Sequence, residues 1–127
     1  MPRAAIIPAA GQPVETVNYD APDVEQGSVL LETIYSEICG TDVHLQQGHL
    51  AGVPYPIIPG HVSVGRVAAT GGKVLDTDGR EINKGDVVTF LDVHETCNHC
   101  WYCLVAHATT RCPERKVYGI TLSLIHI

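Results

Sequence analysis

Short runs of apolar residues alternate with turn-forming residues along most of the chain. The segments 3–9 and 13–20 are predicted to form two strands on either side of a turn at Gly11. The segment 27–39 is rich in Val, Leu, Ile, Thr and Tyr and is the strongest strand candidate. The segment 62–71 alternates between apolar and polar residues, so a strand is predicted there too.

The remaining segments are shorter or more polar. One or two helical turns are predicted over 41–48, because Gly40 or Thr41 can cap a helix and Gly48 can end it. The other predictions are a proline-rich loop at 49–61, turns at 78–79 and 84–86, a strand at 87–91 and an irregular, polar, cysteine-rich segment at 93–116.

These elements predict one mainly β domain, a β-rich barrel with long loops. The chain has 127 residues, including twelve glycines and eight prolines, which favours strands joined by turns over long helices. No two glycines have the G-x-G spacing, and strands do not alternate with helices of 10–15 residues. A dinucleotide-binding Rossmann domain is therefore not predicted in this sequence.

The charges and the lengths of the apolar runs limit the cellular location and the binding partners that we expect. The formal net charge is −6, and the one basic cluster, Arg111, Arg115 and Lys116, is interrupted by Glu114. We therefore expect no nucleic-acid partner. No apolar run resembles a signal peptide or a membrane span, so we expect no membrane partner and a cytoplasmic location. Closely spaced cysteines in a reducing compartment favour metal binding over disulfides.

Four cysteines follow a C-x2-C-x2-C-x8-C pattern: Cys97, Cys100, Cys103 and Cys112. Four thiolates suit the tetrahedral coordination of zinc and leave no position open, which predicts a structural zinc site. His99 and His107 lie in the same loop and could replace a cysteine as ligand. The alternative is a set of free or disulfide-paired thiols.

A second candidate site combines Cys39, at the end of a predicted strand, with His61, which follows the proline-rich loop. The stretch CGTDVH places a thiol, a hydroxyl, a carboxylate and an imidazole within six residues. A catalytic zinc needs about three protein ligands and one open position. Taken singly, such a cysteine or histidine is more often a structural residue.

The motifs CGTDVH, PGHVSVGRV and GDVV and the four-cysteine loop occur in this order within residues 1–121. In this combination the chain resembles the N-terminal half of the zinc-dependent medium-chain alcohol dehydrogenases, including polyol and threonine dehydrogenases. The resemblance implies a GroES-like, partly open β-barrel with a four-cysteine zinc lobe at about 93–116. It also implies oxidation of an alcohol to a carbonyl by hydride transfer to a nicotinamide.

The resemblance assigns roles to individual residues. Cys39 and His61 match ligands of the catalytic zinc, and Asp42 matches a carboxylate that supports this site. Thr41 matches the hydroxyl that passes on the alcohol proton, and His44 the histidine that extends this relay. The four loop cysteines, Cys97, Cys100, Cys103 and Cys112, match the ligands of the structural zinc.

The implied partners are a small alcohol or polyol, two zinc ions per full-length subunit, NAD or NADP bound by a further domain, and further copies in a homo-oligomer.

Three departures from the family pattern matter. Val62 stands where many members have Glu, the last cysteine gap is eight residues instead of seven, and the cofactor domain and the third catalytic zinc ligand are absent. We therefore expect the chain to be a fragment that is inactive by itself.

The end of the sequence leads to a separate expectation. The stretch LSLIHI is apolar and resembles a translated sequencing adapter, so 122–127 is predicted to be a non-native tail after a domain at 1–121; a genuine terminal strand is the alternative. Two other functions are alternatives. A GroES-like zinc module without catalysis would explain the four-cysteine loop, and a zinc-free quinone reductase relative is opposed by Cys39, His61 and that loop.

Overall fold

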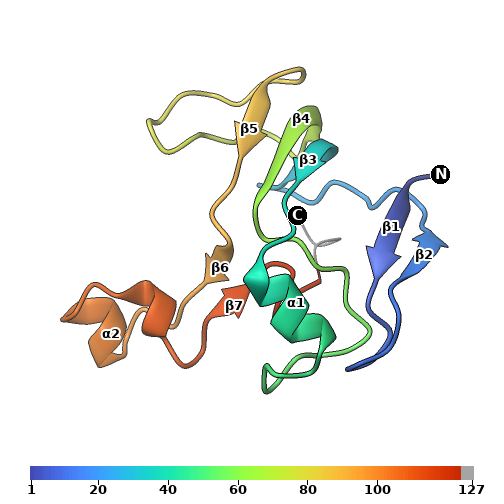
Figure 1. The fold of residues 1–127 in the computed structure, drawn as a ribbon. Helices are drawn as coiled ribbons and strands as arrows, with labels where there is room; N and C mark the ends of the chain where they lie inside the picture. Colours follow the sequence, from blue (N-terminus) through green and yellow to red (C-terminus); the bar gives the residue numbers. More distant parts are fainter. Residues whose placement is uncertain (124–127) are drawn as a thin grey trace.

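The computed structural model describes residues 1–123 as a mainly β fold built from three small antiparallel sheets (Figure 1). The first sheet pairs β1 (Arg3–Ile6) with β2 (Glu15–Asn18), and Ile6 lies opposite Glu15. The turn between them contains Gly11 at φ 72°, as predicted. Ile7 continues β1 by one further bridge to Ile57.

The second sheet has the order β3 (Val29–Ser36), β4 (Ser63–Thr70) and β5 (Val87–Thr89). The predicted strands at 27–39, 62–71 and 87–91 are confirmed; the first two are shorter at both ends, and the third ends two residues early. β3 and β4 pair from Val29↔Thr70 to Ser36↔Ser63, with two register shifts along the way. This pairing spans the whole of both strands. It therefore sets the positions of the segment that follows β3 and the segment that precedes β4.

The third sheet lies at the base of a separate lobe, drawn at the left of Figure 1. It pairs β6 (Val93–Glu95) with β7 (Lys116–Val117). The lobe also contains α2 (Trp101–Leu104) and a 3₁₀ turn at Thr109–Arg111. The prediction that 93–116 is irregular is therefore wrong in part, because the β6–β7 pairing joins distant residues and leaves no local pattern.

The helix α1 (Gly40–Gln46) occupies the segment predicted to be helical. Its N-cap is Cys39, not Gly40 or Thr41 as predicted. The reason is Asp42, whose Oδ2 accepts a hydrogen bond of 2.9 Å from the Cys39 backbone N–H and so fixes the helix start one residue earlier. Gly48, at φ 78°, follows the last turn as predicted.

A small core lies between α1 and the first sheet. Ile7, Leu45 and Ile57 are buried together, with Leu50, Val53, Tyr55 and Ile120 packed against them. Gly119, at φ 70°, approaches the backbone just before His61: a Cβ there would lie 2.7 Å from the Gly60 nitrogen. This close approach requires glycine at position 119 and holds the backbone at Gly60, the residue before His61, in place.

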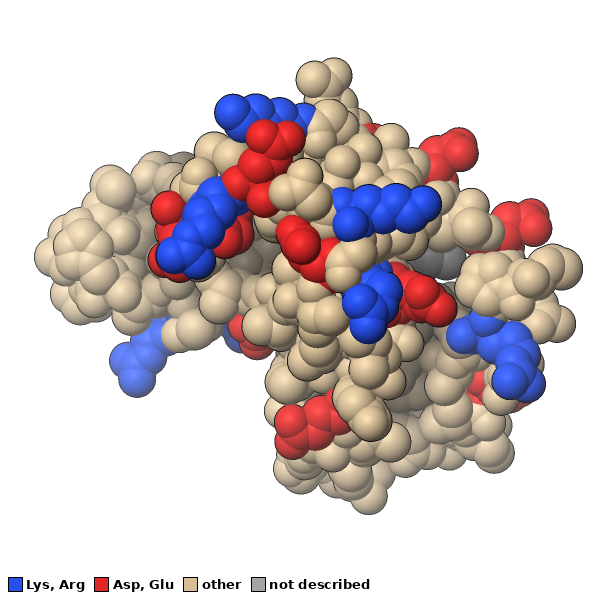
Figure 2. All heavy atoms as spheres, turned by 90° about the horizontal axis from the view of Figure 1, so that it is seen from above, with Lys and Arg blue, Asp and Glu red and all other residues tan. Residues whose placement is uncertain are grey.

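The predicted barrel is open in this structure, since no strand pairing within residues 1–123 closes the three sheets into a ring. In the same part of the chain, no helix has the length and apolar character needed to cross a membrane. One face of the molecule carries acidic and basic side chains beside one another, without a broad region of one sign (Figure 2).

The predicted tail falls mostly outside the described residues. Of 122–127, only Leu122 and Ser123 are described. Leu122 forms a bridge to Tyr118, and the Ser123 hydroxyl accepts a hydrogen bond of 3.1 Å from the Ile58 backbone N–H. The domain boundary at residue 121 remains a prediction, as does the non-native origin of the tail.

Candidate metal centres

The first candidate centre forms where β3 and β4 end side by side. Cys39 follows β3 and caps α1, and His61 precedes β4. Beyond the paired strands, the Glu37 N–H donates to the Val62 carbonyl at 2.9 Å, so the two chain segments stay adjacent. As a result Cys39 Sγ lies 3.3 Å from His61 Nε2, although the residues are 22 positions apart.

Asp42 lies behind this pair on the first turn of α1. Its carboxylate is buried, and its Oδ1 lies 3.7 Å from His61 Nδ1. Within the described part of the chain, neither of these two buried atoms has a hydrogen-bond partner. Cys39, Asp42 and His61 together place their sulfur, oxygen and nitrogen atoms within 4.8 Å of one another.

This donor set fits a zinc ion. A thiolate and an imidazole nitrogen are common zinc ligands, and Sγ and Nε2 face each other at the point where an ion would be bound. If Nε2 binds the metal, Nδ1 carries the proton and faces the Asp42 carboxylate, which is the usual partner of a metal-bound histidine. Asp42 Oδ1 and His61 Nδ1 are thus the two atoms expected to form a hydrogen bond when a bound metal fixes the imidazole ring.

The two residues predicted to relay protons lie on the same helix. Thr41 is half-buried in the first turn of α1, next in sequence to the Asp42 carboxylate, and His44 is exposed one turn later. The Nδ1 atom of His44 lies 3.3 Å from Nδ1 of His49. His49 was not among the predicted site residues. Gly48 is the sequence signal for it, because its left-handed backbone turns the chain back toward α1.

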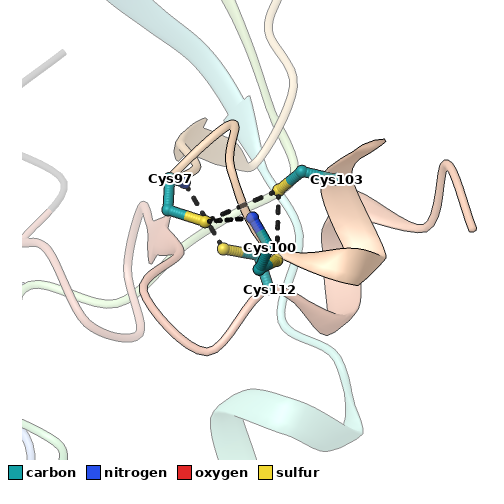
Figure 3. Close-up of side chains that lie close together, drawn as sticks. All are labelled: Cys97, Cys100, Cys103 and Cys112. Carbon is teal, nitrogen blue, oxygen red and sulfur yellow. Dashed lines mark hydrogen bonds between the residues drawn. The ribbon is translucent and has the colours of Figure 1, made fainter. Parts of the chain in front are cut away.

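The four loop cysteines meet in the separate lobe (Figure 3). Their ligand atoms lie within 4.8 Å of one another, with Cys100 Sγ 3.6 Å and Cys97 Sγ 3.9 Å from Cys103 Sγ. A tetrahedral zinc with Zn–S bonds of about 2.3 Å requires sulfurs about 3.8 Å apart. All four thiols are free, so the arrangement fits a zinc ion better than a pair of disulfides.

The local backbone positions these sulfurs. Cys100 caps α2, and the Cys103 N–H bonds to the Cys100 carbonyl at 3.1 Å, which places both thiols on one turn. Cys112 ends the 3₁₀ turn and is fully buried. The longer gap before Cys112 therefore does not keep it out of the cluster. His99 lies near Cys97, whereas His107 is in none of the potential ligand groups of the described residues.

Hydrogen bonding and burial act differently on two of these thiols. The backbone N–H of His99 stabilises the Cys97 thiolate and, with other hydrogen bonds, lowers the pKa of Cys97 to about 6. Burial disfavours the charged form of Cys103 and raises its pKa to about 11. The loop thus already stabilises one thiolate before a metal is bound, and a bound cation would deprotonate the others.

The comparisons with known proteins identify the family of this chain. A family model, the alcohol dehydrogenase GroES-like domain, matches residues 25–123. D-arabinitol dehydrogenase 1 of Uromyces fabae is 31% identical over 107 residues, which are 84% of this chain and 28% of that protein.

Solved structures show the same relationship. The alcohol dehydrogenase of Thermotoga maritima matches 94% of this chain with a TM-score of 0.85 and 35% identity, over 32% of its own length. A dehydrogenase of Sinorhizobium meliloti, described as zinc-binding and solved with NADP, matches 95% of this chain with a TM-score of 0.78 and 26% identity, over 33% of its length. The chain thus spans a third or less of these relatives. Because the family model covers most of its residues, the chain belongs to the alcohol dehydrogenase GroES-like domain family.

Proposed function

We propose that this chain is the zinc-binding catalytic domain of an NAD(P)-linked alcohol or polyol dehydrogenase, which oxidises an alcohol to a carbonyl compound by hydride transfer. The observation that carries this proposal is the 3.3 Å approach of Cys39 Sγ to His61 Nε2, with the Asp42 carboxylate behind the imidazole. The relatives support the substrate class, since they are named as alcohol or polyol dehydrogenases, and one of them was solved with NADP.

Each residue of the first centre has a distinct task in this proposal. Cys39 and His61 would hold a zinc ion, which would supply Lewis-acid polarisation of the alcohol oxygen. Asp42 keeps the His61 ring oriented and its Nδ1 protonated. Thr41 would accept the proton of the alcohol hydroxyl and release its own hydroxyl proton, and His44, which is exposed, would take up that proton and pass one to solvent.

The second centre has a structural task in this proposal. Cys97, Cys100, Cys103 and Cys112 supply four thiolates, so a zinc ion there has no open position for a substrate. Few apolar side chains are buried in this lobe; Val117 is one of them. The binding energy of zinc would therefore stabilise the folded lobe directly.

A cobalt titration tests the two centres. Co²⁺ bound by thiolates absorbs by charge transfer in proportion to the number of sulfurs, so a four-thiolate centre and a one-thiolate centre are distinguishable. We expect two ions per chain, the second bound more weakly. Cys39→Ala and His61→Ala should each remove only the weaker ion, Cys112→Ala only the tighter one, and the control His107→Asn neither. If Cys39→Ala leaves both ions bound, the first centre is not a metal site.

The reaction itself needs a cofactor-binding partner for this domain. We expect no reduction of NAD or NADP by the chain alone, because its sequence has no G-x-G motif. A chimaera in which residues 25–123 replace the matching part of the Thermotoga maritima enzyme should reduce cofactor when supplied with alcohols. The same chimaera with Cys39→Ala should not, and activity retained in it would contradict the proposal.

A zinc module without catalysis is the second candidate function. The observation that favours it is that the four-cysteine centre offers four thiols, whereas among residues 1–123 the first centre brings three donors together. This candidate predicts that Cys39→Ala changes neither the metal content nor any function of the protein. The titration above therefore separates the two candidates.

We also propose a cytoplasmic location and a homo-oligomeric full-length form. The location is supported by the five cysteines, all of which are free, as suits a reducing compartment. The oligomeric form is supported by the family resemblance.

A further inference from the structure

A third group of potential metal ligands lies on the surface of the four-cysteine lobe. Cys97, His99 and Glu114 bring a sulfur, an imidazole nitrogen and a carboxylate oxygen within 4.8 Å of one another. His99 Nε2 lies 3.9 Å from Glu114 Oε1. The Cys97 sulfur belongs to this group and to the four-cysteine cluster at the same time.

The two groups differ in their access to water. The side chains of His99 and Glu114 are 72% and 64% exposed. Cys97, Cys100 and Cys103 are half-buried, and Cys112 is fully buried. An ion arriving from solvent therefore meets the imidazole and the carboxylate first, the Cys97 sulfur next, and the buried Cys112 sulfur last.

The backbone and the charges favour this order. Asn98 has a left-handed backbone, at φ 55°, which turns the chain so that the His99 N–H bonds to the Cys97 sulfur while its imidazole stays exposed. Within residues 1–123, His99 is the one ion-pair partner of Glu114, whereas the neighbouring Lys116 is paired with Glu95. The Glu114 carboxylate thus remains available to attract a cation.

We propose that Cys97, His99 and Glu114 form an outer metal-acquisition site, from which a divalent zinc-type cation passes into the four-cysteine centre through the shared Cys97 thiolate. In this transfer the ion keeps its charge and its bond to Cys97. The nitrogen of His99 and the oxygen of Glu114 leave, the sulfurs of Cys100, Cys103 and Cys112 replace them, and their thiol protons pass to water. This inference rests on the structural zinc proposed above.

An acquisition site has a kinetic signature. His99 and Glu114 bind the ion on the way in and on the way out, but they are not ligands in the final state. Removing them should therefore slow uptake and release by the same factor and leave the equilibrium affinity unchanged. We expect about a tenfold slowing, the lower end of what local charge adds to an association rate.

The experiment compares the metal-free 127-residue chain with the double variant His99→Gln, Glu114→Gln. Uptake of Co²⁺ is followed by the sulfur charge-transfer absorption after rapid mixing, and Zn²⁺ release is followed with a chromophoric chelator, extrapolated to zero chelator. The matched control is His107→Asn, a change at another exposed histidine of the lobe. Circular dichroism verifies that the variants are folded as the parent chain is.

The outcomes are separable. Equal slowing of uptake and release in the double variant, with wild-type rates in the control, supports the acquisition site. Unchanged rates overturn it, and so does a loss of equilibrium affinity, since that would make His99 or Glu114 a resident ligand. If the parent chain takes up no ion in the lobe, it is the structural zinc of the proposed function that fails.

Discussion

At the scale of single residues, Asp42 joins the local fold to the first metal centre. One carboxylate oxygen accepts the Cys39 N–H and so sets the start of α1. The other faces His61 Nδ1 and has no hydrogen-bond partner among residues 1–123. The same side chain therefore positions the Cys39 backbone and the His61 ring, and its two tasks can be separated by substitution.

Replacing Asp42 tests this division. Asp42→Ala should lower the free energy of unfolding by about 1 kcal/mol, because the acceptor for the Cys39 N–H is lost. Asp42→Asn keeps an acceptor oxygen and should be close to wild type in stability. Both variants should bind Co²⁺ at the Cys39–His61 centre about 10–100-fold more weakly, as expected for the partner of a ligating histidine. Wild-type cobalt affinity in Asp42→Asn would show that the carboxylate charge does not support His61.

Tyr118 links burial to pH dependence at the same scale. Its ring packs edge-on against Phe90, and its hydroxyl lies 2.8 Å from Nδ1 of His94. Burial raises the pKa of Tyr118 above its usual value of 10. Since the folded pKa is the higher one, the stability from the neutral ring is fully present below pH 10 and is lost as pH rises through the folded pKa.

Alkaline titration of stability tests this effect. We expect the free energy of unfolding of the wild-type chain to fall above about pH 10, and Tyr118→Phe to lack part of that fall. Tyr35→Phe is the control, because Tyr35 is 76% exposed. Identical alkaline slopes for all three proteins would contradict a role for Tyr118.

At the scale of elements, Leu45 attaches α1 to the core. A helix of seven residues is too short to be stable alone, so packing must hold it. Leu45 is fully buried against Ile7 and Ile57, and the Leu45 carbonyl accepts a hydrogen bond from the Tyr55 hydroxyl. The helix that carries Asp42 is thereby attached to the core.

Truncating this anchor should have a large effect. Leu45→Ala should lower the free energy of unfolding by about 2–5 kcal/mol, because it leaves a cavity in a small core. Leu104→Ala, on the exposed side of α2 with 60% exposure, should change stability by less than about 0.5 kcal/mol. Chemical denaturation of the two variants measures the difference, and equal effects would mean that α1 is held by other contacts.

At the scale of the whole molecule, the body, which consists of the first two sheets and α1, and the four-cysteine lobe are stabilised by different means. The body has a core around Ile57 and the extended β3–β4 pairing. The lobe has two short strands, a four-residue helix and the four cysteines. Its folding should therefore depend on metal, while the folding of the body should not.

Metal removal tests this division. After treatment with a chelator under reducing conditions, amide hydrogen exchange should become fast over residues 97–112 and remain slow in β3 and β4. Adding Zn²⁺ back should restore protection in the lobe. Loss of protection in both regions at once would show that the lobe and the body fold as one cooperative unit.

The sequence predicted the parts of this architecture that depend on neighbouring residues. Its content of β-branched and aromatic residues placed β3. Alternation of apolar and polar residues placed β4, because a strand exposes its side chains to alternate faces. The cysteine spacing predicted the four-thiol cluster, because short spacings bring sulfurs together on one turn. The helix start was misplaced by one residue, since the bond from Cys39 to Asp42 overrides the usual caps.

The tertiary structure decided how distant residues are brought together. The pairing of β3 with β4 brings Cys39 to His61, and the β6–β7 pairing closes the lobe. The contact of His99 with Glu114 had no pattern of its own in the sequence. Local periodicity fixes which face of an element is apolar, but it contains neither the register between strands nor the path of the loops. These depend on packing across the whole chain.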